Sequence, residues 1–220
     1  MAEQSPPYAR AAIAHLRRAD PVLARMIAQV GPYRIARRPE RFQALVRAII
    51  FQQLAGRAAQ AIYDRFVAVF GGSRFPTPAA VLAVGETELR KAGLSRGKIL
   101  YIRDLASHVA DGRLNFRRFH AMDDEEIIAE LTRVKGIGRW TAEMFLMFNL
   151  WRPDVLPVDD LGVRKAAMRA YGMRKMPTAK RLRRLGERWR PYRSVATWYL
   201  WRSITTVTLA DNNTGVPRAR

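Results

Sequence analysis

Apolar residues recur every three or four positions along nearly all of this 220-residue chain, and no alternating β-branched run is long enough to predict a strand. This spacing places the apolar side chains on one face of an α-helix. Glycines such as Gly71, Gly93, Gly112 and Gly172 follow the apolar segments at the place of helix C-terminal caps. We therefore expect an all-α protein built from many short helices.

Residues that favour the first turn of a helix precede several of these segments: Pro39, Thr77 with Pro78, Ser95, the acidic run 123–126, and Thr178. The glycine-containing segment 70–76 is a candidate turn between two lobes. Residues 211–220 lack apolar spacing. We expect one helical unit over residues 1–210 and a flexible tail over 211–220.

The charge balance favours a polyanionic partner. The chain has 39 Lys and Arg against 19 Asp and Glu, a net charge of +20 with a pI near 11.4. Nucleic acid is the first expectation, and an anionic membrane surface is the alternative. No segment has the length and apolarity of a membrane span or a signal peptide, so we expect a soluble intracellular protein.

The absence of cysteine removes several classes of function. Without Cys there is no disulfide framework, no Cys-ligated zinc and no Cys-held iron–sulfur cluster. Three scattered histidines do not form a zinc site by themselves.

The segment 131–142, here called the hairpin, lies between two amphipathic segments and reads LTRVKGIGRWTA. Gly136 and Gly138 let the backbone turn sharply, with Ile137 pointing inward and the N–H groups facing outward at a helix N-terminus. Lys135 and Arg139 flank this turn with positive charge, which suits contact with a DNA phosphate. The alternative is a purely structural helix corner.

Together with four other segments, the hairpin resembles the helix-hairpin-helix DNA glycosylase superfamily, and within it the 3-methyladenine DNA glycosylase II (AlkA-type) branch. The five segments occur in the family's order over residues 40–205, at 42–59, 75–83, 131–142, 156–166 and 187–201. The resemblance implies a two-lobed helical fold with the active-site cleft between the lobes. It also implies binding of damaged double-stranded DNA and hydrolytic excision of flipped, alkylated bases. Only about forty residues precede the match, so we expect the N-terminal β-rich domain of longer members to be lacking and its aromatic pocket residues to be absent or replaced.

The superfamily's catalytic aspartate matches Asp160, which follows Gly138 by 22 residues in the segment LPVDDLGVRK. Breaking an N-glycosidic bond builds oxocarbenium character on the sugar, and a nearby carboxylate stabilises that charge and orients water. No metal is required for this chemistry. The alternative is that Asp159 or Asp160 only caps the next helix.

The resemblance also bears on strand cleavage and on ions. Branches that cut the DNA strand carry a Schiff-base lysine two residues after the second hairpin glycine, where this chain has Trp140, whose indole cannot form an imine. We therefore expect no lyase activity. The family's hairpin holds a monovalent cation on main-chain carbonyls, here those of Thr132, Val134 and Ile137. We expect no other cofactor.

The resemblance assigns a base pocket. Trp140 and Trp201 match the family's pocket tryptophans, and Met144 occupies a position that is often aromatic, which affects the range of lesions. Aromatic rings suit an alkylated purine because it carries positive charge. The alternative for both tryptophans is core packing. Tyr192 and Trp198 are expected to be structural.

Leu54, in the segment FQQLAG, matches the residue that the family inserts into the gap left by the flipped base. An apolar wedge beside glutamines suits entry from the minor groove. The alternative is one more core leucine.

Two other functions remain open at this point. One is a helix-hairpin-helix module that binds DNA without chemistry. The other is a glycosylase for another lesion, such as uracil or a deaminated purine. In either case we expect a monomer that is associated with DNA, in the cytoplasm or in a eukaryotic nucleus.

Overall fold

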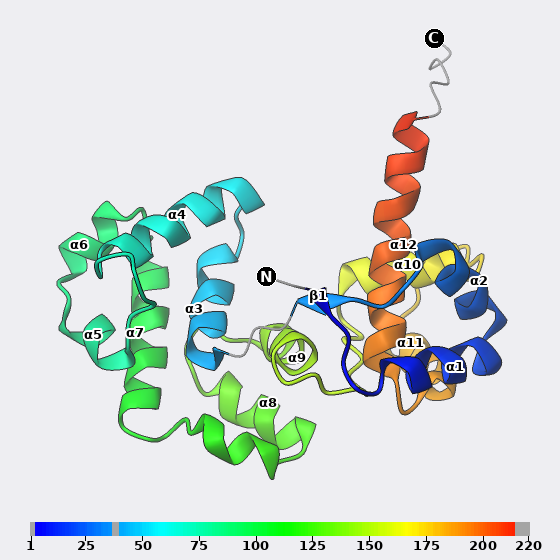
Figure 1. Ribbon diagram of the computed structural model, residues 1–220, viewed down its shortest axis with the longest axis horizontal. Helices are drawn as coiled ribbons and strands as arrows, with labels where there is room; N and C mark the ends of the chain where they lie inside the picture. The colour runs from blue at the N-terminus through cyan, green and yellow to red at the C-terminus, as the bar shows by residue number, and fades with distance from the viewer. Residues whose placement is uncertain (1–2, 37–39, 214–220) are drawn as a thin grey trace. The chain divides into compact units, whose positions relative to one another are not determined.

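Short helices make up most of this computed structural model, as the apolar spacing predicts (Figure 1). The structure describes the backbone of residues 3–36 and 40–213, and the side chains of residues 5–35 and 40–204. A small antiparallel ladder, which the sequence did not predict, pairs β1 (Glu3–Gln4) with β2 (Ile35–Ala36). The all-α fold class is confirmed.

The chain divides into two compact units, and the second is inserted into the first. Unit 1 combines the described residues before position 37 with those from Trp151 onward, and unit 2 contains residues 40–150. The segment 70–76, a candidate turn between lobes, lies inside unit 2, so that prediction is wrong. The reason is aromatic packing, because Phe70 and Phe75 lie 5.3 Å and 6.0 Å from Phe66 between ring centroids.

Unit 1 is built around its last helix. That helix, α12, packs against α2 and α10, and α1 packs against α2 and η2. Leu16, Leu23, Trp189 and Tyr199 are fully buried in its core. The helical elements of the unit are α1 (Ala9–Ala19), α2 (Pro21–Val30), α10 (Leu161–Ala170), α11 (Ala179–Gly186), the 3-10 helix η2 (Glu187–Trp189) and α12 (Arg193–Asn213).

Part of the predicted flexible tail lies in a helix. Helix α12 continues through Asn213, which places residues 211–213 in the helix. Residues 214–220 of the predicted tail lie outside the described residues. None of the helices in the described part of the chain is long and apolar enough to cross a membrane.

A buried carboxylate, which the sequence did not reveal, organises the core of unit 1. Asp20 is 0% exposed and caps α2, with its Oδ1 accepting hydrogen bonds from the main-chain N–H groups of Val22 and Leu23. Its Oδ2 accepts from the Tyr171 hydroxyl at 2.6 Å and from Trp189 Nε1 at 3.0 Å. Burial, followed by the contact with Asp20, raises the pKa of Tyr171. Both oxygens of Asp20 are thus satisfied, as a buried charge requires.

Unit 2 is arranged around α7, which packs against α3, α5 and α6, while α9 packs against α8 and α3. Its helical elements are α3 (Arg41–Phe51), α4 (Gly56–Ala68), α5 (Pro78–Ala83), α6 (Glu86–Lys91), α7 (Arg96–Ala110), the 3-10 helix η1 (Phe116–His120), α8 (Asp124–Thr132) and α9 (Arg139–Phe148).

The predicted helix ends are confirmed wherever the structure describes them. The side chains of Thr77, Ser95, Asp123 and Thr178 cap α5, α7, α8 and α11. The expected signal at Pro39 lies outside the described residues, and α3 begins at Arg41. The glycines predicted to follow helices have positive φ angles between 60° and 94°: Gly71, Gly72, Gly93, Gly112 and Gly172.

Candidate active site

The two glycines of the hairpin have different structural roles. Gly136 has φ +81°, and a Cβ there would overlap the ring of Tyr101. Gly138 has an ordinary φ of −91°, and a Cβ there would meet nothing within 4 Å. Ile137 is buried, as predicted. The fold therefore needs glycine at position 136, whereas at position 138 it leaves open space beside a helix end.

That open space adjoins the N-terminus of α9. Gly138 is the N-cap of this helix, and it brings no side-chain hydrogen bond to the first turn. The first N–H groups of a helix carry partial positive charge and favour an anion. The geometry of the turn fits the predicted phosphate contact.

The positive charge of Arg139 beside the turn is paired with acidic side chains. Arg139 donates to the two carboxylate oxygens of Glu125 at 2.8 Å and 2.5 Å, and to Glu143 at 3.1 Å. Its hydrogen bonds to Glu125 raise the pKa of Arg139 further above its usual value. Arg139 flanks the turn, as expected, and two carboxylates lie within reach of its guanidinium group.

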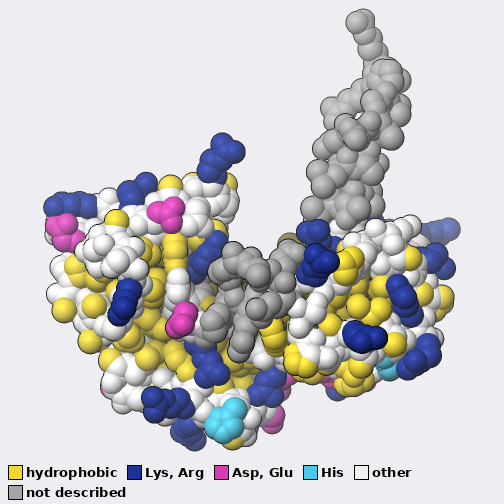
Figure 2. Space-filling model, viewed as in Figure 1, with side chains coloured by type: hydrophobic (Ala, Val, Ile, Leu, Met, Phe, Trp, Pro, Cys, Tyr) yellow, Lys and Arg dark blue, Asp and Glu magenta, His cyan; other side chains and the backbone are white. Residues whose placement is uncertain are grey.

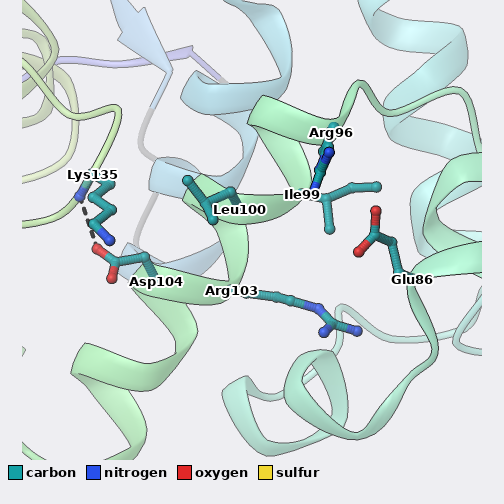
Figure 3. A pocket seen from close by; sticks show the side chains of 7 residues that line it. All are labelled: Glu86, Arg96, Ile99, Leu100, Arg103, Asp104 and Lys135. Carbon is teal, nitrogen blue, oxygen red and sulfur yellow. Dashed lines mark hydrogen bonds between the residues drawn. The ribbon is translucent and has the colours of Figure 1, made fainter.

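Lys135 is exposed, and a residue of α7 holds its main chain by a hydrogen bond. The Lys135 N–H donates to Asp104 Oδ2 at 2.8 Å, the contact drawn as a dashed line in Figure 3. Both residues line a cavity of about 310 Å³ whose walls come from unit 2 alone. Lys135 thus keeps an exposed side chain beside a turn whose backbone is held in place.

Leu54 and Trp140 are not core residues. Leu54 is 38% exposed and follows Gln53, which has φ +56°. Trp140 is 51% exposed, in the first turn of α9, and Met144 lies one turn later, half-buried. This exposure does not fit the core-packing alternatives for Leu54 and Trp140.

Asp160 lies in unit 1 and caps a helix, which is one of the two roles considered for it. It is the N-cap of α10, and its Oδ1 accepts from the Val163 N–H at 2.7 Å. The same oxygen accepts a hydrogen bond from Trp201 Nε1 at 3.0 Å. Asp159 is exposed, whereas Asp160 is half-buried. Capping and an indole contact therefore hold the Asp160 carboxylate in one orientation.

Gly162 leaves room for the contact between Asp160 and Trp201, a role that the sequence did not reveal. A Cβ at Gly162 would lie 3.0 Å from Asp160 Oδ1 and 3.2 Å from Trp201 Nε1, closer than side chains normally approach. Glycine in the first turn of a helix costs stability relative to alanine. That unfavourable placement, two residues after Asp160, is the signal that points to a close approach.

The other aromatic residues of unit 1 pack among themselves. Trp198 meets Tyr33 and Tyr199 edge-on, with centroids 5.0 Å and 4.9 Å apart, and Tyr192 stacks on Tyr8 at 6.2 Å. These contacts fit the structural roles expected for Trp198 and Tyr192.

The predicted residues thus fall into two groups. Unit 1 brings Asp160 and Trp201 together, and unit 2 contains the hairpin with Trp140, together with Met144 and Leu54. Figure 2 shows Lys and Arg side chains on the drawn face of both units, with fewer Asp and Glu side chains, in keeping with the net charge of +20.

Known proteins are similar to this chain in sequence and in structure. The sequence pattern of the HhH-GPD superfamily of base excision DNA repair proteins matches residues 46–191. A DNA-3-methyladenine glycosylase of Schizosaccharomyces pombe is 36% identical over 201 residues, which cover 90% of this chain and 87% of that protein. A structure of the 3-methyladenine DNA glycosylase of Schizosaccharomyces pombe in complex with abasic DNA matches with a TM-score of 0.79 at 35% identity, over 88% of this chain and 96% of that one. A DNA-3-methyladenine glycosidase from Bacillus halodurans matches with a TM-score of 0.82 at 38% identity, over 95% of both chains.

Proposed function

The chain belongs to the HhH-GPD superfamily of base excision DNA repair proteins, and on this premise we propose that it is a monofunctional DNA glycosylase. Its substrate is double-stranded DNA that contains alkylated bases of the 3-methyladenine type. The names of its relatives support the lesion class, and their coverage of nearly the whole chain supports a shared activity. The acting form is a monomer in the compartment that holds the DNA.

The observation that carries this proposal is the hydrogen bond between Trp201 Nε1 and Asp160 Oδ1. It places an oriented carboxylate beside an indole ring at the start of α10. As the N-glycosidic bond breaks, positive charge develops on the sugar, and the Asp160 carboxylate stabilises it. The same carboxylate orients the water that attacks the sugar. Because Trp201 and Val163 both donate to Oδ1, the carboxylate needs little reorganisation when the charge appears.

The aromatic side chains supply recognition of the base. An alkylated purine carries positive charge, which the electron-rich face of an indole attracts. Trp201 and the exposed Trp140 both serve this role. Met144 adds a polarisable apolar contact in place of a further ring. Since the alkylated base is already a good leaving group, the pocket acts without a general acid.

The absence of lyase activity follows from Trp140. This residue stands where strand-cutting branches have their lysine, and an indole has no amine that could attack the sugar. The product is therefore an abasic strand that stays intact.

DNA is held by backbone contacts and opened by a wedge. The N–H groups at the start of α9 bind a phosphate beside Gly138, and the side chain of Lys135 adds positive charge. Leu54, exposed on its loop, enters the base stack when the damaged base turns out.

A Na⁺ or K⁺ ion on the main-chain carbonyls of Thr132, Val134 and Ile137 is part of the proposal. The Val134 carbonyl accepts the Ile137 N–H at 3.1 Å, and a carbonyl oxygen has a second lone pair for an ion. The turn is thus compatible with such an ion, which would add positive charge beside the phosphate. Replacing Na⁺ and K⁺ by a large organic cation at constant ionic strength should then weaken DNA binding.

One experiment tests the proposed activity. The protein is incubated with duplexes that each carry one lesion, among them 3-methyladenine, uracil, hypoxanthine and 8-oxoguanine, and the released base is measured. Release of the alkylated base with an uncut strand supports the proposal. If only another base is released, the protein is a glycosylase for that lesion and the proposed lesion class is wrong. Binding without release of any base favours the non-catalytic module.

A further inference from the structure

The loop that carries Leu54 is held by a lysine from another helix. Lys98 Nζ, on α7, donates to the carbonyl of Ile50 at 2.6 Å and to the carbonyl of Gln52 at 2.9 Å. These carbonyls lie at the C-terminal end of α3, where they lack partners within the helix. Burial lowers the pKa of Lys98. The half-buried ammonium group thus holds this helix end.

A side-chain hydrogen bond of Gln52 joins the loop to the hairpin. Gln52 Nε2 donates to the Gly136 carbonyl at 2.8 Å, across 84 positions of the sequence. Gln52 is therefore bound on both sides, with its carbonyl on Lys98 and its side chain on the hairpin. Leu54 follows it by two residues.

The same face of α7 supports the hairpin itself. Lys98, Tyr101 and Asp104 follow one another at intervals of three residues on successive turns. Tyr101 packs against Gly136. Asp104 accepts a hydrogen bond from the Lys135 N–H, which Figure 3 shows as a dashed line. One stripe of α7 thus contacts both segments that are proposed to touch DNA.

The side chains of the Leu54 loop are not packed into the core. The side chains of residues 53–58 are all exposed, so no core packing holds them. Gln53 has φ +56°, which costs energy for a residue other than glycine and persists only where its surroundings enforce it. The side-chain hydrogen bonds of Lys98 and Gln52 lie on the N-terminal side of this strained position. They add to two main-chain hydrogen bonds, from the Gln52 N–H to the Ile49 carbonyl at 3.3 Å and from the Leu54 N–H to the Phe51 carbonyl at 3.4 Å.

We propose that Lys98 and Gln52 form a clamp that positions Leu54 relative to the hairpin, so that a phosphate bound at the hairpin sets the point where Leu54 enters the duplex. This inference rests on the proposed function. Lys98 and Gln52 are positioning residues, since each acts through Leu54. The competing explanation is that Lys98 only stabilises the end of α3.

The test measures the preference for DNA with a gap in the base stack. Affinity is measured for an undamaged duplex and for one with a tetrahydrofuran abasic site, using wild type, Lys98→Met and the charge-matched control Lys91→Met. Lys91 is exposed and pairs with Glu88 on α6. Lys98→Met should lower the preference for the abasic duplex about tenfold, the worth of a charge-assisted hydrogen bond. Lys91→Met should leave the preference unchanged.

A double-mutant cycle separates the clamp from simple stabilisation. In a Leu54→Ala background, Lys98→Met should cause no further loss of preference, because the residue that it positions is gone. Additive losses would overturn the clamp. Should Lys98→Met fail to fold in a thermal melt, Gln52→Ala takes its place in the cycle, with the same two outcomes.

The binding readout also keeps the two proposals apart. A wild type that prefers the abasic duplex but releases no alkylated base refutes the proposed function and leaves the clamp test intact. A wild type that releases the base, together with a Lys98→Met variant of unchanged preference, overturns the clamp alone. A wild type without any preference for the abasic duplex overturns the clamp as well.

Discussion

Trp201 Nε1 lies 3.0 Å from Asp160 Oδ1 and donates a hydrogen bond to it, so the proposed stacking residue also orients the proposed catalytic carboxylate. Gly162 keeps the space between them open. The residues proposed for base recognition and for chemistry therefore share one contact within unit 1, and substitutions on its two sides should have separable effects.

Asp160→Asn should lower the rate of base release by about three orders of magnitude, since it removes the charge that stabilises the transition state. Asparagine keeps an oxygen for the Val163 N–H, so the cap of α10 and DNA affinity should change little. The measurement is single-turnover release with enzyme in excess, which isolates the chemical step. Asp159→Asn, at the exposed neighbour, is the control and should behave as wild type. A rate for Asp160→Asn within about tenfold of wild type would contradict the assignment.

Trp201→Phe should lower the maximal rate about tenfold, because the ring remains but the N–H donor to Asp160 is lost. KM should change less than the rate, since the loss falls on the orientation of the carboxylate. Trp198→Phe is the matched control, because Trp198 packs against Tyr33 and Tyr199 away from this contact. Equal losses in both variants would show that the effect is one of packing.

Gly136→Ala should mainly lower stability, whereas Gly138→Ala should mainly weaken DNA binding. Alanine at position 136 must adopt a positive φ and displace Tyr101, so the free energy of unfolding should fall by about 2–4 kcal/mol. Alanine at position 138 should cost less than about 1 kcal/mol, but its methyl group enters the space beside the α9 N-terminus and should weaken binding to every duplex sequence. Urea unfolding and DNA titration on both variants check this pair. A stable Gly136→Ala variant would refute the structural half.

Borohydride present during turnover should trap no protein–DNA adduct above the level of an inactive control, because position 140 offers no amine for an imine. Denaturing electrophoresis detects both a covalent adduct and a cut strand. Either product in the wild-type lane would assign the protein to a strand-cutting branch.

Asp20→Asn should destabilise unit 1 by about 1–3 kcal/mol without changing the chemical step. The four groups around the Asp20 carboxylate are all donors, so an amide must turn its own N–H₂ towards two of them. Thermal or urea unfolding measures the loss, and base release well below the melting temperature checks the chemistry. Asp111→Asn, at an exposed pair with Arg113, is the control and should stay within about 0.5 kcal/mol. A Tm for Asp20→Asn equal to that of wild type would exclude a structural role.

Local signals in the sequence were reliable where the structure describes them. The caps at Thr77, Ser95 and Asp123 and the turn at Gly136 each depend on hydrogen bonds or φ angles within a few residues. The helical periodicity that gave the fold class is local in the same sense. Such features can be read from the sequence because the residues that create them are neighbours.

Contacts between distant residues could not be predicted in this way. The pairing of Arg139 with Glu125 spans 14 positions, the Asp160–Trp201 contact spans 41, and that of Gln52 with Gly136 spans 84. Each depends on how helices pack. The same limit explains the wrong lobe boundary, because a turn rich in glycine looks alike inside a lobe and between two lobes.

The insertion of unit 2 into unit 1 sets an order of assembly on the ribosome. Unit 2 is continuous in sequence, so it can fold as soon as residues up to 150 have left the exit tunnel. Unit 1 has to wait, since Asp20 is held by Tyr171 and Trp189, which lie 151 and 169 positions later. The half that contains the hairpin thus forms before the half that contains Asp160. A nascent chain stalled between the two would already have its proposed DNA-binding turn and would not yet have the carboxylate for excision.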